Sequence, residues 1–370
     1  MNRCRILIVG GGIGGLTSAI ALGRRGFEVA IIERDPTWSV YGVGIIQQAN
    51  VIRAMAQLGV VEDYIHAGFG FDGVEIFAPD GRRLAAVQSP RLVEGYPANV
   101  GIGRKALQAV LSERARSSGA QIKLGVTVHA LEDDGEGVAV RFSDGGADRY
   151  DLLIGADGLY SQIRTILFPD ASKPLFENQG VWRYNFPRPA DVVCLHAYEG
   201  PRGIGLVPLS NDVMYMYLTT PEPGNPRYLR EGLAQTMRGK LAGAAPRIAA
   251  LAEAITDDDG VVYKPLESVF LDGPWYKGRC VLIGDAAHAT TPHLGQGAGM
   301  AIEDSLVLAD ELARFDRIED ALEAFQARRQ DRCRYIVEAS RAICRAQVAG
   351  EPVDQARATG EMFKKVAEPI

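Results

Sequence analysis

Short apolar runs broken by turn-forming residues dominate the start of the chain, and the first run predicts a strand, a turn and a helix in close succession. The run ILIV at 6–9 suits a buried strand, and LTSAIALGRR at 16–25 has helical spacing. A second apolar run, VAIIE at 29–33, ends in an acid. Strand, glycine turn, helix, strand and acid in this order are typical of a βαβ unit that binds a dinucleotide.

The glycines between this first strand and helix have distinct predicted tasks. Gly10 permits the sharp turn, Gly12 leaves backbone N–H groups open to phosphate oxygens, and Gly15 lets helix and strand approach closely. Glu33 is placed to accept hydrogen bonds from both hydroxyls of a ribose. The alternative is a glycine-rich connection that binds no ligand. The flanking strand, helix and acid argue against it. The cofactor-binding residues predicted at this end are Gly10, Gly12, Ile13, Gly14, Gly15, Glu33 and Gly44.

Further along, the pattern predicts a second region rich in strands. Residues 74–87 are typical of a hairpin around Pro79-Asp80-Gly81, and 175–270 form proline-punctuated strands with one helical stretch near 227–255. Helices are expected over 103–118 and 298–315, with one or two packed helices in the remainder. Gly101 to Ala106 nominally fits GxGxxA, but YPANVGI before it is a poor strand, so a helix start is predicted there instead of a second fingerprint.

Composition narrows the class of protein. With 370 residues, 47% hydrophobic and 23% charged, the chain can bury a large core, and its net charge of −6 without a basic run argues against nucleic-acid binding. The apolar start has too short a leader for a signal peptide, and the C-terminal RATGEMFKKVAEPI is too polar for a membrane anchor. Five scattered cysteines without a CxxC pair suit a reducing cytoplasm and predict no metal site.

Two further motifs place a carboxylate directly after a buried strand. Asp157 follows DLLIGA, and Asp285 follows CVLIG and leads to TPHLGQGAG at 291–299, at the head of a helix. Together with the N-terminal turn, these motifs resemble, in order and over nearly the whole chain, the FAD-dependent aromatic hydroxylases, which are single-component flavoprotein monooxygenases like para-hydroxybenzoate hydroxylase.

Pattern and resemblance together imply an α/β fold with an α+β second domain. A Rossmann-like FAD-binding domain is assembled from discontinuous segments and joined to a mixed β-sheet substrate domain and C-terminal helices. The expected boundaries are 1–70, 98–174 and 271–330 for the FAD-binding domain, 71–97 and 175–270 for the substrate domain, and 331–370 for the helices.

The resemblance also assigns cofactor contacts. It implies that Arg34 lies close to the adenosine, that Arg104 and Gln108, one helical turn apart, approach the phosphate and ribityl chain, and that Asp285 binds a ribityl hydroxyl. Asp157 resembles the aspartate near the pyrophosphate and the nicotinamide route. NADH or NADPH is expected to bind transiently, in keeping with a single nucleotide fingerprint.

A helix that begins near Ala298 would direct free N–H donors at the N1–C2=O edge of reduced flavin. Gly295, Gly297 and Gly299 would allow the ring to approach. A glycine-rich turn that only links strand to helix is the alternative.

The reaction implied by the family is ring hydroxylation through a flavin C4a-hydroperoxide, with O2 and NAD(P)H as co-substrates. Strand alternation places Tyr215 and Tyr217 on one face, Met214 and Met216 on the other, and the tyrosine face is expected to see the flavin. These phenols are candidate catalytic and substrate-binding groups, with packing in an ordinary sheet as the alternative.

Two arginines and the flavin loop complete the candidate substrate site. Arg183 and Arg202 are candidates to clamp a carboxylate or an acidic ring, with a solvated surface position as the alternative. Pro292 and His293 are expected to meet the substrate, and neutral His293 is a candidate proton acceptor near pH 7, whereas His288 is expected to fix the loop.

Other functions fit parts of the sequence. A flavin halogenase carries Trp-x-Trp, whereas Trp38, Trp182 and Trp275 are far apart. A flavin oxidase or dehydrogenase and a nonenzymatic flavin-binding module stay open. The expected partners are a small aromatic or heteroaromatic substrate and O2, in a monomer or homodimer.

Overall fold

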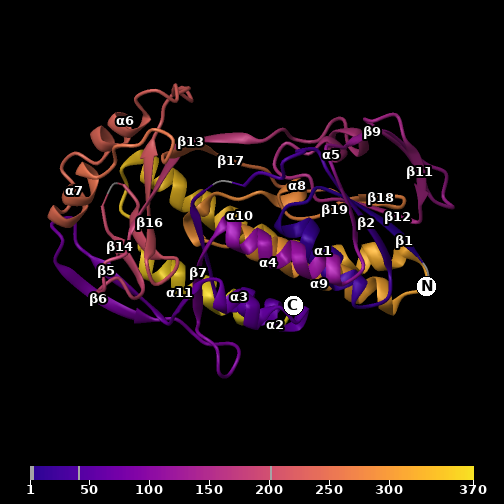
Figure 1. The fold of residues 1–370 in the computed structure, drawn as a ribbon, viewed down its shortest axis with the longest axis horizontal. Helices are drawn as coiled ribbons and strands as arrows, with labels where there is room; N and C mark the ends of the chain where they lie inside the picture. The colour runs from indigo at the N-terminus through magenta and orange to yellow at the C-terminus, as the bar shows by residue number, and fades with distance from the viewer. Residues whose placement is uncertain (1–3, 41, 201) are drawn as a thin grey trace.

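A mostly parallel, six-stranded sheet around the first apolar run forms one half of the molecule (Figure 1). The computed structural model describes residues 4–40, 42–200 and 202–370. The strand order in this sheet is β18 (Tyr276–Lys277), β19 (Cys280–Leu282), β12 (Leu152–Gly155), β1 (Arg5–Val9), β2 (Glu28–Glu33) and β8 (Gln121–Leu124). All neighbours pair in parallel except β18 and β19. The predicted βαβ unit is confirmed as β1, α1 (Ile13–Gly23) and β2.

The turn between β1 and α1 depends on close backbone contact. Gly10 has φ +112°, in the region that favours glycine, and a Cβ on Gly15 would lie 1.9 Å from the Gly10 carbonyl oxygen. α1 then packs against α4 (Arg104–Ser117) and α9 (Gly297–Arg314), so the first helix is buried between two others. The helices predicted at 103–118 and 298–315 are therefore both present.

A seven-stranded sheet forms the second half. Its order is β17 (Val262–Ser268), β13 (Leu175–Pro187), β16 (Val213–Pro221), β15 (Ile204–Pro208), β14 (Leu195–Tyr198), β5 (Gly73–Phe77) and β6 (Arg83–Gln88). β5 and β6 form the predicted hairpin, and β5 joins β14 in parallel although the other pairings are antiparallel. One face is covered by α6 (Leu233–Lys240) and α7 (Pro246–Glu253), beside Trp182, Met214 and Met216.

The helical stretch predicted near 227–255 is thus two helices. The chain breaks between them because Gly243 takes φ +74° and Pro246 starts the second helix at a position where its missing N–H costs nothing.

Two small antiparallel sheets complete the strands. One has the order β11 (Ala147–Tyr150), β10 (Val138–Phe142) and β9 (Val128–Asp133), and the other β3 (Gly44–Gln47), β7 (Asn99–Gly103) and β4 (Phe69–Phe71). The expectation of a poor strand before Arg104 is wrong, because β7 is buried between β3 and β4. That pairing is antiparallel, so Gly101 to Ala106 forms no second βαβ unit, and a helix does start at Arg104.

The remaining helices are α2 (Ala49–Leu58), α3 (Val61–His66), α5 (Gln162–Leu167), α8 (Asp285–His288), α10 (Ile318–Ala349), α11 (Gln355–Ala367) and the 3-10 turn η1 (Pro292–Leu294). α10 contacts α9 at one end and β13 and β16 at the other, so it spans both sheets (Figure 1). It runs without a break through residue 330, where the sequence suggested a boundary. Among the described residues, no helix has the length and apolar character needed to cross a bilayer.

A buried network of charges holds α8, α9 and α10 together. Arg329 is fully buried and donates from Nε to Asp304 Oδ1 and from Nη1 to Glu303 Oε2, each at 2.7 Å. His288 Nε2 lies 2.7 Å from Asp304 Oδ2, which also accepts from the Gly284 N–H. Burial alone would raise the pKa of Asp304, but His288 and Arg329 hold it at about 2. His288 therefore fixes the loop after β19, as expected.

Replacing Arg329 with methionine should lower the free energy of unfolding by about 3–5 kcal/mol, because two buried carboxylates would each lose one cation and a direct hydrogen bond, although His288 stays beside Asp304 and Arg332 beside Glu303. Arg357→Met is the matched control: the Arg357 side chain is 75% exposed and pairs with Glu361 on the surface of α11, so its loss should be much smaller. Urea unfolding measures both. Equal losses in the two variants would contradict this role of the network.

Candidate active site

A cavity of about 1160 Å³ is bounded by both large sheets and the C-terminal segment. Its walls come from the N-terminal end of α1, the start of α4, the loop between β19 and α9, one face of the seven-stranded sheet, and residues within 350–363. The structure thus gathers most of the predicted site residues around one space.

The glycine turn forms one end of this cavity. Gly12, Ile13 and Gly14 line it, and Gly12 caps α1 without a side-chain hydrogen bond. A Cβ on Gly12 would meet no protein atom within 4 Å, so its missing side chain leaves room for something other than this chain. Gly10 and Gly15 lie behind the turn and are needed for packing. The open N-terminus of α1 is suited to an anion.

Glu33 and Arg34 lie beside this end and not on the cavity wall. The Glu33 carboxylate accepts from the N–H groups of Gly11 and Asp35, at 2.8 and 2.9 Å, and so braces the glycine turn. Arg34 is exposed. The Trp38 indole donates to the Gly11 carbonyl at 2.8 Å, a brace that the sequence did not indicate.

The start of α4 and the neighbouring strand β3 form the next part of the wall. Arg104, Gln108 and Gly44 all line the cavity, and Gln108 donates to the Gly11 carbonyl at 3.2 Å. A Cβ on Gly44 would press on the ring of Tyr215, at 2.7 Å. These residues connect the turn with the tyrosine end of the cavity.

Asp285 presents its carboxylate to the cavity and accepts no hydrogen bond from the described chain. Desolvation by the surrounding protein raises the pKa of this carboxyl, and the nearby His288 and Arg104 oppose that effect. Asp157 differs: its side chain accepts from Ser161 Oγ at 2.5 Å and from the Ile163 N–H at 3.0 Å, while its neighbours Ala156 and Gly158 line the cavity.

The N-terminus of α9 faces the cavity as predicted. Gly295 takes φ +66° after η1, and α9 starts without a side-chain cap, so the first N–H groups of the helix stay open. Gly297 and Ala298 line the cavity, as does Pro292. Gly299 lies on the opposite side, where a Cβ would meet Gln296 at 2.8 Å.

Tyr215, Tyr217 and Arg183 stand on the cavity face of the seven-stranded sheet. Both tyrosines come from β16, and Arg183 on β13 is the cross-strand partner of Tyr217. Burial lowers the pKa of Arg183 to about 10, an effect to which Arg104 adds and which Tyr215 opposes. Arg183 therefore stays a cation at neutral pH, and it makes no ion pair with any carboxylate in the described ranges.

His293 lines the cavity, but both its ring nitrogens have protein partners. Nδ1 lies 3.0 Å from Thr291 Oγ1 and Nε2 lies 3.2 Å from Gln347 Oε1, which suits a neutral ring that donates from Nε2. Burial lowers the pKa of His293 to about 4. This corrects the expectation of a proton acceptor tuned near pH 7, because the ring is too weak a base and its lone pair is already used.

Arg202 does not reach the cavity. Its guanidinium donates to the carbonyl groups of Lys240 and Ala242 at the end of α6, which is a common way to satisfy the last carbonyls of a helix. The substrate contact expected for Arg202 is therefore contradicted by its position.

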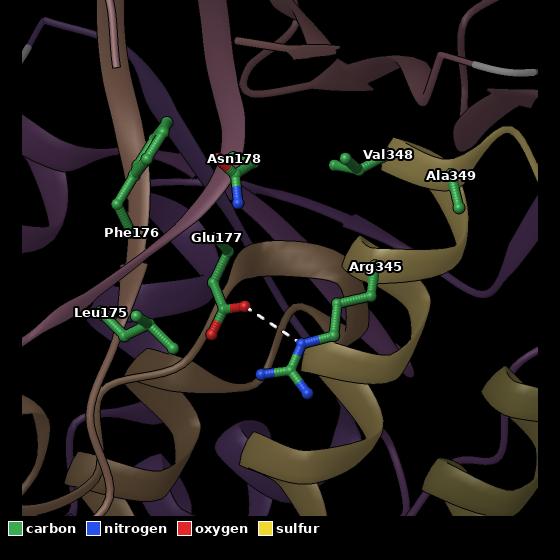
Figure 2. Close-up of a pocket in the computed structure, with 7 residues that line it drawn as sticks. All are labelled: Leu175, Phe176, Glu177, Asn178, Arg345, Val348 and Ala349. Carbon is green, nitrogen blue, oxygen red and sulfur yellow. Dashed lines mark hydrogen bonds and ion pairs between the residues drawn. The ribbon is translucent and has the colours of Figure 1, made fainter. Parts of the chain in front are cut away.

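The sequence did not indicate the C-terminal wall. Gln347, Val353, Thr359, Met362 and Phe363 line the cavity. The apolar spacing in α11 predicted a packed helix, but no signal in it pointed to this space. A smaller hollow of about 270 Å³ lies where β13 meets the end of α10 (Figure 2), and Arg345 there donates to Glu177 at 3.4 Å. None of the predicted site residues lines it.

Comparison with known proteins agrees with this geometry. Residues 3–340 match the family model described as an FAD binding domain. The chain is 34% identical over 352 residues to the putative FAD-dependent monooxygenase YetM of Bacillus subtilis, covering 94% of this chain and 95% of the relative. It is 32% identical to aurachin C monooxygenase/isomerase of Stigmatella aurantiaca, covering 90% and 87% of the two chains. A crystal structure of Klebsiella pneumoniae HpxO complexed with FAD and uric acid superposes with a TM-score of 0.84, at 26% identity over 99% of this chain and 93% of that one.

The chain therefore belongs to the FAD-binding-domain family of flavoproteins. The expected FAD-dependent monooxygenase class, the fold and FAD as cofactor are confirmed. The residues present fit the cofactor. The space at Gly12 and the open N-terminus of α1 offer phosphate contacts, the uncapped N-terminus of α9 offers contacts to the flavin edge, and the Asp285 carboxylate, which has no hydrogen-bond donor among the described residues, offers a hydroxyl contact.

Gly12→Ala and Gly15→Ala should separate binding from folding. Alanine at 12 meets no protein atom, so stability without FAD should change by less than about 0.5 kcal/mol, while FAD affinity should fall about tenfold or more. Alanine at 15 collides with the Gly10 carbonyl and should cost about 1–3 kcal/mol of stability. Thermal unfolding of the FAD-free protein and FAD titration measure the two effects. Equal FAD affinity in Gly12→Ala and the parent would contradict the phosphate role.

Proposed function

We propose that this chain uses FAD, NAD(P)H and O2 to hydroxylate an aromatic or heteroaromatic ring that carries an acidic group. The observation that carries this proposal is Arg183, a cation without a carboxylate partner, placed beside two tyrosines in the cavity of a flavoprotein. The proposed setting is the cytoplasm, in a monomer or homodimer, without nucleic acid or membrane.

Arg183 favours an anionic or acidic ligand for an energetic reason. A guanidinium removed from water is costly unless an anion compensates it. Arg104 on the same cavity adds a second positive charge, and Tyr215, Tyr217 and aliphatic side chains such as Leu195 also line the cavity. A flat ring with a carboxylate, phenolate or acidic ring N–H satisfies the guanidinium and packs on this wall.

Tyr215 and Tyr217 act in the proposal as neutral hydrogen-bonding groups. Burial raises the pKa of both phenols, so neither ionises near neutral pH. A neutral phenol donates to an oxygen or ring anion on the substrate and stabilises the electron-rich form that is open to oxygen transfer. Both phenols stand on one face of β16 and line the same cavity as the N-terminus of α9.

In this proposal Gly12 and α1, then Arg104, Gln108 and Asp285, and finally the N-terminus of α9 would hold FAD. The bound cofactor would supply the redox chemistry with NAD(P)H and O2. The open N–H groups of α9 favour negative charge at that end of the cavity. Neutral His293, held by Thr291 and Gln347, fixes the loop beside the substrate and keeps an uncharged wall there.

The relative crystallised with uric acid supports a heteroaromatic substrate, since uric acid is a flat ring system with acidic N–H groups. The purified FAD-loaded protein should be screened with hydroxybenzoates, hydroxypyridines and purines for accelerated NADH or NADPH oxidation, with 18O2 as oxidant. Label in the product supports hydroxylation. Substrate oxidation without label makes the chain an oxidase or dehydrogenase, and no stimulated NAD(P)H consumption by any compound favours a binding module.

Arg183→Gln should raise KM for an acidic substrate about 10- to 100-fold, because a charge-assisted hydrogen bond contributes about 1.5–3 kcal/mol. The neutral methyl ester or ether of the same compound should lose much less. Arg202→Gln removes the same charge outside the cavity and should leave the acid-to-neutral ratio of kcat/KM unchanged. An unchanged ratio in Arg183→Gln, with FAD fully bound, would remove Arg183 from substrate recognition.

A further inference from the structure

A histidine, a cysteine and a glutamate meet on two neighbouring strands of the seven-stranded sheet. Glu75 on β5 is the direct cross-strand partner of His196 on β14, and Cys194 lies two residues before His196. One ligand-type atom from each of the three lies within 4.8 Å of the other two. The sequence predicted no metal site, because Glu75 lies far from Cys194 and His196 along the chain and the Cys-x-His pair alone matches no metal motif.

This cluster lies on the face of the sheet that looks away from the flavin cavity. Side chains alternate between faces along a strand, and Val74, Ile76, Leu195 and Ala197 from the same two strands line the cavity. Glu75, Cys194 and His196 therefore point to the opposite face. There the rings of His196 and Phe77 lie 5.1 Å apart, and the Arg247–Asp191 ion pair stands nearby.

His196 lacks the partners that a buried histidine normally has. Only 2% of the residue is exposed, and neither Nδ1 nor Nε2 makes a hydrogen bond to any described residue. Glu75 Oε2 lies 3.5 Å from Nε2, beyond good hydrogen-bond geometry. Two unsatisfied buried nitrogens are costly, and a ligand that satisfies at least one of them would remove part of that cost.

We propose that Glu75, Cys194 and His196 bind a zinc ion. Imidazole nitrogen, thiolate sulfur and carboxylate oxygen are the three ligand types that Zn²⁺ takes in proteins, whereas Mg²⁺ and Ca²⁺ prefer oxygen alone. Arg83 Nη2 holds Glu75 Oε1 at 3.0 Å, which leaves Oε2 directed at His196. On binding, Cys194 loses its proton to solvent and supplies thiolate. Water completes the fourth position, since Cys194 and Glu75 are partly exposed.

The ion would join two segments far apart in the sequence at the point where the β5–β6 hairpin attaches to the rest of the sheet. The strands β5 (Gly73–Phe77) and β14 (Leu195–Tyr198) pair in parallel over four residue pairs. Zinc would cross-link the two strands at this short pairing. Figure 1 shows β5, β14 and α7 together at that end of the molecule. The same strands carry part of the substrate wall on their other face, so the cross-link also stiffens that wall.

The test uses the full-length FAD-loaded protein, stripped of metal by a chelator and dialysed against Zn²⁺. One equivalent of zinc is expected by elemental analysis. Co²⁺ in its place should give the ligand-field absorption of a tetrahedral thiolate site at wavelengths longer than the flavin bands. Zn²⁺ should also slow amide hydrogen exchange in residues 73–88, while Mg²⁺ at the same concentration should not.

Cys194→Ser and His196→Asn should each weaken Zn²⁺ binding more than about 100-fold, because losing a direct ligand exceeds the loss of an outer hydrogen bond, and should abolish the Co²⁺ spectrum. His66→Gln, which changes an exposed histidine outside any such cluster, should bind zinc like the parent. Bound FAD in each variant shows that the fold persists. Failure of the parent to retain zinc, or equal retention by the Cys194 and His196 variants, would overturn the proposal.

Discussion

The pairing of Arg329 with Asp304 and Glu303 is the constraint on which the rest of the site depends. These three residues are fully buried. Asp304 also contacts His288 and accepts a hydrogen bond from the Gly284 N–H, and Glu303 accepts one from the Asn50 side chain. The loop that carries Asp285, the start of α9 and the path of α10 are thereby fixed to one another. Charge this deep is costly unless every partner is present, so the arrangement tolerates few alternative packings.

The cavity beside this charge network favours negative charge at both of its ends. Two uncapped helix N-termini favour negative charge along the cofactor path, and Arg183 with Arg104 favours it at the tyrosine end. Burial keeps three further groups on the cavity wall uncharged near neutral pH: His293 is neutral, and both tyrosines keep their protons. The protein thus supplies orientation and a fixed field, in keeping with a family in which the cofactor carries the redox chemistry.

Local rules were enough to predict the parts of the site that lie within one element. The β1–α1–β2 unit, the open space at Gly12, the shared face of Tyr215 and Tyr217 and the start of α9 follow from periodicity and glycine placement. Residues whose role depends on a distant partner were not accessible in that way. Arg202 binds carbonyl groups at the end of α6, and His293 makes a hydrogen bond with Gln347 from α10. The C-terminal wall includes residues of α11, whose sequence pattern indicates an apolar face but not what that face packs against.

The order of the walls along the chain has a consequence during synthesis. The dinucleotide turn emerges from the ribosome first, the tyrosine strand more than two hundred residues later, and the segment 350–363 after almost everything else. The glycine turn nevertheless gains its full surroundings only after the tyrosine strand has been made, because α1 packs against α9 (Gly297–Arg314). Until α11 docks, with Arg53 and Arg332 gripping the carbonyl groups of Glu368 and its neighbours, a flavin ring in the cavity would remain open to solvent.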